Sequence, residues 1–281
     1  MIVDQAPPFT LENATARLEV EGIVALTECP FEITATEADL LTPSFSSAGV
    51  KNISLSLGGA LRGATAGPVQ TAQLTGLLTR YAAWSHALLL AIAPHYGSAL
   101  EFGRTSFRPR PVEATQLGGR KDDRRLHVDA FASQPTGGKR ILRVFSNINP
   151  VGEARRWQVG EPFEAYAKRW LPAARKPAPG EAWVLERLGI TKARRTGYDA
   201  LMLALHDAAK LDAGYQRDAP RRDLAFEPGD AWVVFTDQVV HAAISGRHAL
   251  EQTFYLPVQA MAAPETSPLR VLERLSGRRL V

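Results

Sequence analysis

A series of short strand-like runs, separated by turn signals, most constrains how this chain can fold. The runs are rich in aromatic and β-branched residues, as strands are. Turn formers separate them, for example at 135–138 (PTGG) and at Ser245-Gly246. The pattern predicts a mainly β protein, with strands at 99–112, 124–131, 140–149, 157–163, 231–236, 239–244 and 250–258.

Two other stretches predict helices that flank or interrupt these strands. Apolar residues recur at spacings of three and four between Gln73 and Ile92, and again between Gly197 and Ala213. That period is typical of amphipathic helices. The first helix is expected to end at the breaker cluster 94–97, and residues 54–59 and 63–68 before it are expected to be loops.

The composition is that of a globular protein. In 281 residues, 45% hydrophobic and 22% charged side chains exclude disordered, collagenous and coiled-coil classes. The single cysteine, Cys29, excludes an intrachain disulfide framework and a Cys-rich zinc module. Neither the opening segment MIVDQAPPFT nor any apolar run has the pattern of a secretion signal or a membrane span. A cytoplasmic location is therefore expected.

The chain is mildly basic, with a formal net charge of +4. Basic side chains cluster at 104–125, 217–222 and 270–279. No recognition motif or aromatic platform accompanies them, so nucleic acid is not expected as a partner. A phosphorylated small molecule, a sugar acid or an anionic membrane surface fits better, although a surplus of four charges can also be without function.

Three side chains carry the candidate chemistry. His127 and Asp129 lie two residues apart, and on a strand such residues point to the same face. They could therefore share one metal ion, with His241 as the third ligand. Two imidazoles and one carboxylate leave three positions of an octahedral ion open, which is the arrangement of non-haem Fe(II) oxygenases. The other histidines are interpreted as structural or solvated, namely His86, His95, His206 and His248.

Long blocks around these residues resemble the Kdo hydroxylase family. The blocks are DDRRLHVDAFASQPTGGKRILRVFSNINPVGEARRWQVGEPFE at 122–164, YDALMLALHD at 198–207 and FTDQVVHAAISGRHALEQTFYLPV at 235–258. The resemblance implies a double-stranded β-helix, a cupin-like jelly roll, within a single domain of residues 1–281. The resemblance covers residues 101–258. Within the single domain we expect an N-terminal helical and loop region at about 1–98, packed on the barrel, the β-helix at about 99–258 with a helical insertion near 164–227, and a C-terminal tail at 259–281.

The same resemblance implies an activity. Members of the family are Fe(II)- and 2-oxoglutarate-dependent dioxygenases that use O2, hydroxylate C3 of a Kdo sugar on lipid A, and release succinate and CO2. Kdo-bearing lipid A would be the partner, with peripheral contact on the cytoplasmic face of the inner membrane. Two alternatives remain open from the residues: a 2-oxoglutarate oxygenase acting on a protein side chain or small metabolite, and a non-catalytic jelly-roll binding protein.

The distal carboxylate of 2-oxoglutarate needs a cation, and a planar guanidinium suits it. The positions about ten residues after His241, where many relatives carry this cation, are Leu250, Glu251 and Gln252 here. We therefore expect Arg143, on the strand 140–149, to bind the carboxylate, with Asn147 and Gln252 as hydrogen-bonding neighbours. Arg247 is the second choice.

Contacts to the substrate are expected from basic and polar side chains. They are Arg104, Ser106, Arg108 and Arg125. Trp157 is expected either as a platform for the sugar or as part of the core. The C-terminal segment LRVLERLSGRRLV is weakly amphipathic and basic, which fits either contact with a membrane surface or a helix packed on the barrel.

Overall fold

Two antiparallel sheets form the centre of the protein, seen in a computed structural model that describes residues 11–114, 118–175 and 178–281. The opening segment, in which no secretion signal was expected, lies outside the described residues. The larger sheet has the order β1 (Ile23–Leu26), β8 (Ala231–Phe235), β5 (Arg140–Asn147), β10 (Ala249–Leu256), β4 (Glu101–Arg108), β2 (Ile53–Leu55) and β3 (Leu61–Arg62). The smaller sheet has the order β7 (Arg222–Phe226), β6 (Arg155–Val159) and β9 (His241–Ser245).

Aromatic side chains fill one end of the space between the two sheets. Phe145 of β5 stacks on Trp232 of β8 with ring centroids 5.1 Å apart. From the smaller sheet, Trp157 and Phe226 pack edge-on and face-on against the same indole. All four rings are buried. Inward-pointing residues that alternate with outward ones, on two facing sheets, are the arrangement expected of a jelly roll, so the predicted fold class is confirmed.

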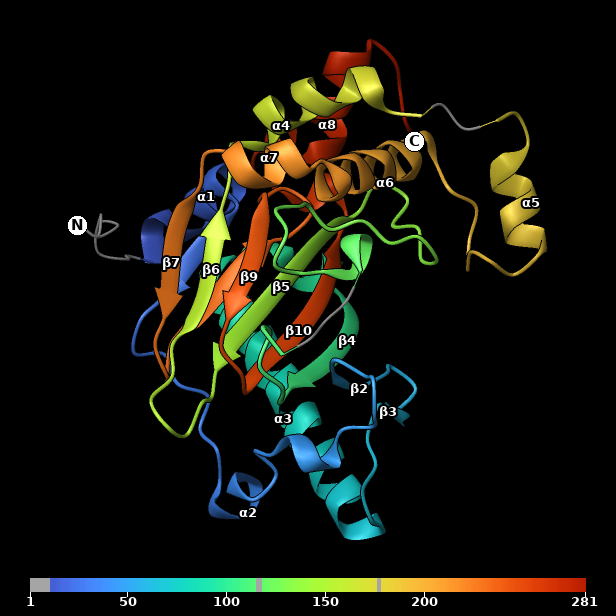
Figure 1. Cartoon of the computed structure of the whole chain (residues 1–281). Helices are drawn as coiled ribbons and strands as arrows, with labels where there is room; N and C mark the ends of the chain where they lie inside the picture. Colours follow the sequence, from blue (N-terminus) through green and yellow to red (C-terminus); the bar gives the residue numbers. More distant parts are fainter. Residues whose placement is uncertain (1–10, 115–117, 176–177) are drawn as a thin grey trace.

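The long helix α3 (Pro68–Ile92) packs behind the larger sheet (Figure 1). It begins with a proline in its first turn and is followed by the predicted breaker at Pro94. Its apolar stripe, which includes Leu74, Leu78 and Tyr81, is buried, as its spacing predicts. Helix α1 (Leu11–Glu21) lies near the C-terminal end of α3, and the short α2 (Ala35–Ala38) near its N-terminal half.

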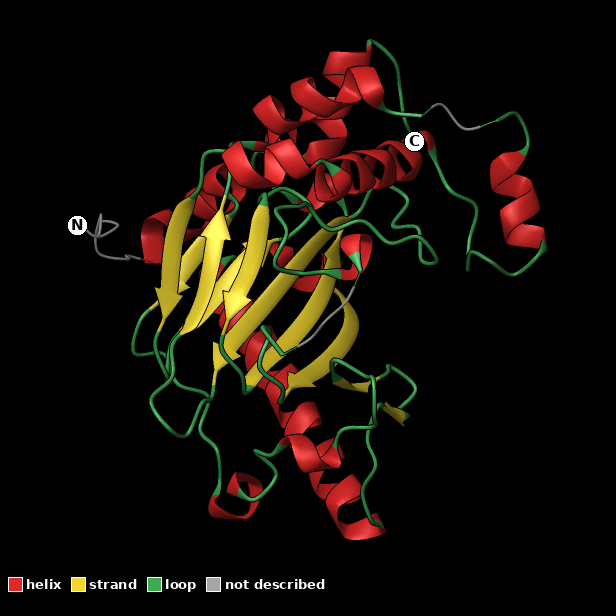
Figure 2. Cartoon of the chain, in the orientation of Figure 1, coloured by secondary structure: helices red, strands yellow, loops and turns green. Residues whose placement is uncertain are grey.

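A helical insertion connects β6 to β7 and covers one end of the sheets (Figure 2). It contains α4 (Phe163–Trp170), α5 (Glu181–Arg187), α6 (Gly197–Leu211) and α7 (Ala213–Asp218). Helix α6 is the one predicted at 197–213. Helix α4 falls where the sequence suggested only the end of a strand and a polar region, yet it buries Phe163, Tyr166 and Trp170.

The C-terminal segment packs on the body of the protein. Helix α8 (Pro268–Ser276) buries Leu269, Val271 and Leu272 in the main hydrophobic core. Of the two roles expected for this segment, the structure therefore supports the packed helix. Short 3₁₀ helices complete the described elements, at Pro43–Phe45, Pro94–Ala99, Gly119–Lys121, Leu171–Ala173, Val258–Ala260 and Pro264–Thr266. No helix in the described residues is long and apolar enough to cross a membrane.

Two expectations for local structure are wrong. Residues 53–55, of which 54 and 55 were expected to be loop, form β2 at the edge of the larger sheet, and β1 pairs at its other edge. The N-terminal region therefore extends the sheet as well as packing on it. Residues 124–131 do not form a strand, because only His127 makes a bridge and charged residues precede it.

Candidate active site

His127 and His241 lie side by side because their main chains pair. The N–H of His127 donates to the carbonyl of His241 at 3.0 Å, and the N–H of His241 donates back at 2.8 Å. His241 is the first residue of β9, whereas His127 lies on an irregular segment. The side-chain amide of Gln216 bonds both backbone groups of Leu126, at 2.8 and 2.9 Å, and so takes the place of a neighbouring strand there.

The predicted triad comes together in space. One potential ligand atom from each of His127, Asp129 and His241 lies within 4.8 Å of the other two. The N–H of Asp129 donates to the carbonyl of Thr236 at 2.7 Å, which fixes the backbone of the proximal motif beside the distal one. Among the described residues, this is the one group of histidine, cysteine and carboxylate side chains with spacing that suits a metal ion.

The two imidazoles are oriented for metal binding. Nδ1 of His127 lies 2.7 Å from the carbonyl of Arg125, and Nδ1 of His241 lies 2.9 Å from the carbonyl of Val239. A carbonyl only accepts, so each Nδ1 carries a proton and each Nε2 keeps its lone pair. Burial lowers the pKa of both histidines, which favours the neutral form that ligates metals.

The carboxylate of the triad is held ionised by its neighbours. Burial alone would raise the pKa of Asp129, but the Arg143 guanidinium outweighs it and holds that pKa below its usual range. Arg143 Nη2 lies 2.8 Å from Asp129 Oδ2. Two neutral imidazoles and one carboxylate are the donor set of a facial Fe(II) site, so the residues fit that metal.

A cavity of about 630 Å³ opens beside the triad. Its wall comes from the inner faces of β4, β5, β6, β9 and β10, from residues 51–58 and from the loop 131–134. A volume of that size is typical of small-molecule sites and can hold a cosubstrate together with part of a sugar.

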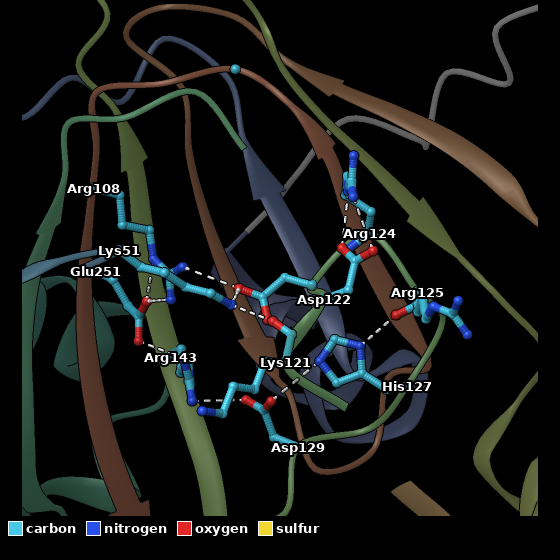
Figure 3. A network of polar contacts seen from close by, with 12 residues as sticks. Lys51, Arg108, Lys121, Asp122, Arg124, Arg125, His127, Asp129, Arg143 and Glu251 are labelled. Carbon is cyan, nitrogen blue, oxygen red and sulfur yellow. Dashed lines mark hydrogen bonds and ion pairs between the residues drawn. The ribbon is translucent and has the colours of Figure 1, made fainter. Parts of the chain in front are cut away.

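A chain of alternating charges crosses the cavity wall from the triad (Figure 3). Arg143 bridges Asp129 to Glu251, which also pairs with Arg108. Arg108 then approaches Asp123, whose carboxylate lies 2.9 Å from Nζ of Lys51. Burial would raise the pKa of Glu251, but Arg108 and Arg143 lower it, so this carboxylate is also ionised.

Of the four residues expected to bind 2-oxoglutarate, Arg143 lies on the cavity wall and the other three do not. Arg247 instead pairs with Glu153 at 3.2 Å, and is not part of the wall. The amide of Asn147 is used by backbone groups, including the carbonyl of Phe226 at 2.9 Å. Gln252 lies on the face of β10 that points away from the cavity. Its side-chain oxygen accepts from the hydroxyl of Thr105, and its side-chain N–H donates to the carbonyl of Thr253.

Three of the four residues expected to contact the substrate line the cavity, namely Arg104, Ser106 and Arg108. Ser106 is buried, with Oγ 2.9 Å from Oγ of Ser54, and Arg108 is committed to the charge chain described above. The guanidinium of Arg125 donates to the carbonyl of Lys210 at 2.7 Å and is not part of the wall.

Strand β6 contributes two cavity residues that sequence reasoning did not assign to the cosubstrate. Arg155 and Trp157 lie two residues apart, so both point inward, and both are nine-tenths or more buried. Nε of Arg155 and Nε1 of Trp157 have no hydrogen-bond partner among the described residues. The Trp157 ring also stacks on His241, with centroids 5.0 Å apart. The spacing Arg-x-Trp on a strand was the available signal.

The remaining histidines do not join the triad. His86 packs against Phe102, and His95 lies 3.6 Å from Glu19. His206 bonds Asp207 through Nδ1 and meets the His127 ring edge-on, while His248 is buried seven residues after His241. None of the four belongs to the group of potential ligand atoms, and their interpretation as structural or solvated residues stays a prediction.

The sequence matches a family profile almost from end to end. Residues 4–279 match 3-deoxy-D-manno-oct-2-ulosonic acid (Kdo) hydroxylase. The chain belongs to the Kdo hydroxylase family. No protein with curated annotation matches the sequence.

Solved structures of a Kdo hydroxylase agree with this membership. The apo structure of the Kdo hydroxylase KdoO, a non-haem Fe(II) α-ketoglutarate-dependent dioxygenase, is 45% identical, with a TM-score of 0.93 over 97% of this chain and 93% of that chain. The KdoO complex with α-ketoglutarate and Fe(III) is 44% identical, with the same TM-score and coverage. KdoO is also known in complex with cobalt(II), at 45% identity and the same coverage.

Proposed function

We propose that this protein is an Fe(II)- and 2-oxoglutarate-dependent dioxygenase that hydroxylates a Kdo sugar. The observation that carries the proposal is the geometry of His127, Asp129 and His241, whose ligand atoms converge at the wall of a cavity of about 630 Å³. The relatedness to KdoO, described as a Kdo hydroxylase of this cofactor class, supports the same chemistry here. A non-catalytic binding protein would not need two imidazoles fixed with their Nε2 atoms free.

The triad residues would hold the metal. Nε2 of His127, Nε2 of His241 and a carboxylate oxygen of Asp129 would ligate Fe(II) and leave positions for 2-oxoglutarate and O2. Bound iron and 2-oxoglutarate would supply the oxidation of a C–H bond, with release of succinate and CO2. The protein's own part is to keep the ligands deprotonated and in place, to position both substrates and to exclude water.

The distal carboxylate of 2-oxoglutarate has two candidate cations on the cavity wall. Arg143, the prediction from the sequence, is already compensated by Asp129 and Glu251. Arg155 has no carboxylate within ion-pair distance among the described residues, and its Nη1 bonds only the carbonyl of Gly246, at 2.7 Å. Burial and the nearby Arg108 both lower the pKa of Arg155, so an anion beside it would relieve both costs.

We therefore place the distal carboxylate at Arg155, with Arg143 flanking the cosubstrate nearer the metal. The indole N–H of Trp157 is a second buried donor without a partner, on the same strand and face. Because Trp157 also stacks on His241, it lies between the candidate metal site and Arg155. Two unpaired donors in a row along one strand suit an extended, doubly charged cosubstrate.

The Kdo unit would enter from the open side of the cavity. Kdo is a sugar acid, and Arg104 on β4 and Lys192 after α5 are exposed cations on the cavity wall that could meet its carboxylate. The resemblance points to C3 of a Kdo on lipid A as the position hydroxylated, and to a substrate at the cytoplasmic face of the inner membrane. Ser106, Arg108 and Arg125 are less suited to direct contact, since other groups of the protein already bind them.

Two measurements test the proposed function. The purified protein with Fe(II), 2-oxoglutarate, O2 and a Kdo-bearing acceptor should release succinate and add the mass of one oxygen to the acceptor. Mass spectrometry of the lipopolysaccharide core from expressing cells should show the same added mass on Kdo. Succinate release with an unchanged Kdo acceptor would favour a 2-oxoglutarate oxygenase with another substrate.

A further inference from the structure

The two histidines of the candidate metal site are held in different ways. His241 begins β9, and its backbone has a neighbour on each side, Val159 of β6 on one and His127 on the other. His127 has β9 on one side. In the part of the chain that the structure describes, no strand pairs with residues 122–129 on the opposite side. Another part of the protein must therefore hold His127 from there.

The side chain of Gln216, on α7 of the helical insertion, occupies that side. Neighbouring residues of an extended segment direct their backbone groups to opposite sides, so Leu126 turns its N–H and its carbonyl away from β9. The side-chain oxygen of Gln216 accepts from this N–H at 2.8 Å, and its amide donates to this carbonyl at 2.9 Å. The amide also donates to the carbonyl of Ala209, in the last turn of α6, at 2.9 Å. Both donors and the acceptor are used, which fixes the orientation of the carboxamide.

The backbone that carries Gln216 is itself anchored in the core. Helix α7 begins after Asp212, whose carboxylate accepts from the N–H of Tyr215 at 2.7 Å. Tyr215 is buried, and its ring packs edge-on against Trp170 of α4 with centroids 5.2 Å apart. Gln216 follows directly in the chain, so it reaches Leu126 from a fixed support.

The end of α6 holds the residues just before Leu126. Nζ of the buried Lys210 donates to the carbonyl of Arg120 at 3.1 Å, and the carbonyl of Lys210 accepts from the guanidinium of Arg125 at 2.7 Å. The carbonyl of Arg125 in turn accepts from Nδ1 of His127 (Figure 3). The insertion is therefore bonded to the same residues that orient this imidazole.

We infer that Gln216 is a positioning residue for the metal, because it holds the backbone from which His127 presents Nε2 to the ion. The inference rests on the metal site of the proposed function. Leu126 is fully buried, so without the amide its N–H and carbonyl would lack partners. The segment would shift to find others, and His127 would shift with it. His241 would stay in place, since β9 keeps its pairing with β6.

Hydrogen exchange of the metal-free protein tests the hold itself. Gln216→Met keeps most of the side-chain volume and removes all three hydrogen bonds. Amides in peptides that cover 122–130 should exchange at least about tenfold faster than in the wild type, whereas β5 and β10 should exchange at the wild-type rate. Thr15→Val is the control, since it removes a partly buried bond of 2.7 Å between α1 and α3 and should not affect 122–130.

A cobalt(II) titration measures the consequence for the metal. The dissociation constant of Gln216→Met should rise at least about tenfold, as is typical when a group that orients a metal ligand is removed. Gln216→Asn carries the same carboxamide on a chain one methylene shorter, which cannot reach both backbone groups of Leu126. It should therefore weaken cobalt binding as well, whereas Thr15→Val should bind cobalt like the wild type.

A spectroscopic signature separates positioning from a general loss of stability. In the cobalt(II) protein, the Nδ1 protons of His127 and His241 should give two exchangeable, paramagnetically shifted signals in proton NMR spectra. With cobalt in excess, Gln216→Met should displace or broaden one signal and leave the other in place. A general loosening of the fold would change both.

Two results would overturn the inference. One is unchanged exchange at 122–130 in Gln216→Met, and the other is an unchanged cobalt dissociation constant with both NMR signals in place. If the wild type bound no cobalt while Gln216→Met still exchanged faster at 122–130, the proposed metal site would fail. The role of Gln216 toward the metal would fail with it, and its hold on the segment would stand.

Discussion

The peptide groups of His127 and His241 hydrogen-bond to each other in both directions, at 3.0 and 2.8 Å. Two candidate metal ligands that are 114 positions apart in the chain are thus joined through their backbones. The spacing of their imidazoles is set by main-chain bonds and by the carbonyls that accept from each Nδ1, before any metal binds. A site organised in this way should survive removal of the ion.

The first prediction concerns the metal. His127→Ala or His241→Ala should abolish metal binding and turnover, because either change removes one of three ligands, while the backbone pairing preserves the fold. Titration with cobalt(II), followed by its visible absorption bands, and circular dichroism measure the two effects. His95→Ala is the control, as that side chain is partly exposed and lies outside the triad. Normal cobalt binding by either triad variant would contradict the assignment.

The second prediction concerns Arg155. Arg155→Ala removes the buried cation placed at the distal carboxylate, a loss on the order of 2–5 kcal/mol. The affinity for 2-oxoglutarate should fall at least about tenfold, with metal binding unchanged. Anaerobic titration of 2-oxoglutarate into the Fe(II) protein, followed by the metal-to-ligand absorption band, gives the affinity. Arg156→Ala is a matched control, since Arg156 is the next residue on β6 and is exposed on the opposite face.

The third prediction compares Arg143 with Arg247. Arg143→Ala should also weaken 2-oxoglutarate binding at least about tenfold, because it leaves Asp129 and Glu251 without their shared cation beside the cosubstrate. Arg247→Ala should change the same titration little, since Arg247 pairs with Glu153 away from the cavity. A large loss for Arg247→Ala with a normal titration for Arg143→Ala would move the cation to the turn after His241.

The fourth prediction concerns acid stability. His248 is buried, both its ring nitrogens lack a partner among the described residues, and burial together with Arg247 lowers its pKa. The unfolded chain binds this proton below about pH 6.5, whereas the folded protein does not until a lower pH. The free energy of unfolding should therefore fall as the pH drops below that value, by at most about 1.4 kcal/mol per pH unit from this residue.

His248→Asn tests this sign. Asparagine tolerates the positive φ of 56° at this position, and it does not titrate. Urea unfolding at pH 7.5 and pH 5.5 should show a smaller loss of stability in the variant than in the wild type. If both proteins lose the same free energy over that interval, His248 is not a source of acid sensitivity.

The fifth prediction concerns the buried ion pair between Arg140, at the start of β5, and Asp237, just after β8. Arg140 is fully buried, with Nε 2.8 Å from Asp237 Oδ2, and its guanidinium lies 3.8 Å from the centre of the Phe235 ring. Arg140→Met should lower the free energy of unfolding by about 3–5 kcal/mol, because Asp237 remains buried without its partner. Arg140→Met/Asp237→Leu should recover much of that loss. Urea unfolding at neutral pH measures both, and an additive double variant would argue against the pairing.

Much of the β framework could be predicted because period and turn chemistry act locally. Strands β4, β5 and β8 fall inside the predicted runs, and β10 begins one residue before its run. The predicted helices are present as α3, which begins five residues earlier than predicted, and α6. The prediction of a strand at 124–131 was wrong because the partners of this segment lie far away in the sequence. Its hydrogen bonds go to the side chain of Gln216 and to His241, both far along the chain, and no local pattern reports such partners.

The candidate site shows the same contrast between features that the local sequence determines and features that depend on distant parts of the chain. The triad could be predicted, since its residue types and spacing restrict the chemistry. Asn147 and Gln252 were expected at the cosubstrate, but the register of β5 and β10 turns their amides to backbone or buried partners instead. Arg155 was missed because it stands out only by having no carboxylate partner among the described residues. That property exists only in the folded protein.

The helical insertion leaves β6 after Val159 and returns at Arg222, and these two residues are paired neighbours in the smaller sheet. Its ends therefore meet at one point, so the part of the insertion around α5 can change in length and sequence without moving β9, whereas Gln216 and Lys210, which bond the segment before His127, have to stay. Residues that border the cavity mouth, such as Lys192, lie on this segment, whereas His127, Asp129 and His241 lie outside it. Grafting residues 181–195 from a relative, with Lys210 and Gln216 retained, should therefore transfer acceptor preference while the oxidative chemistry stays the same.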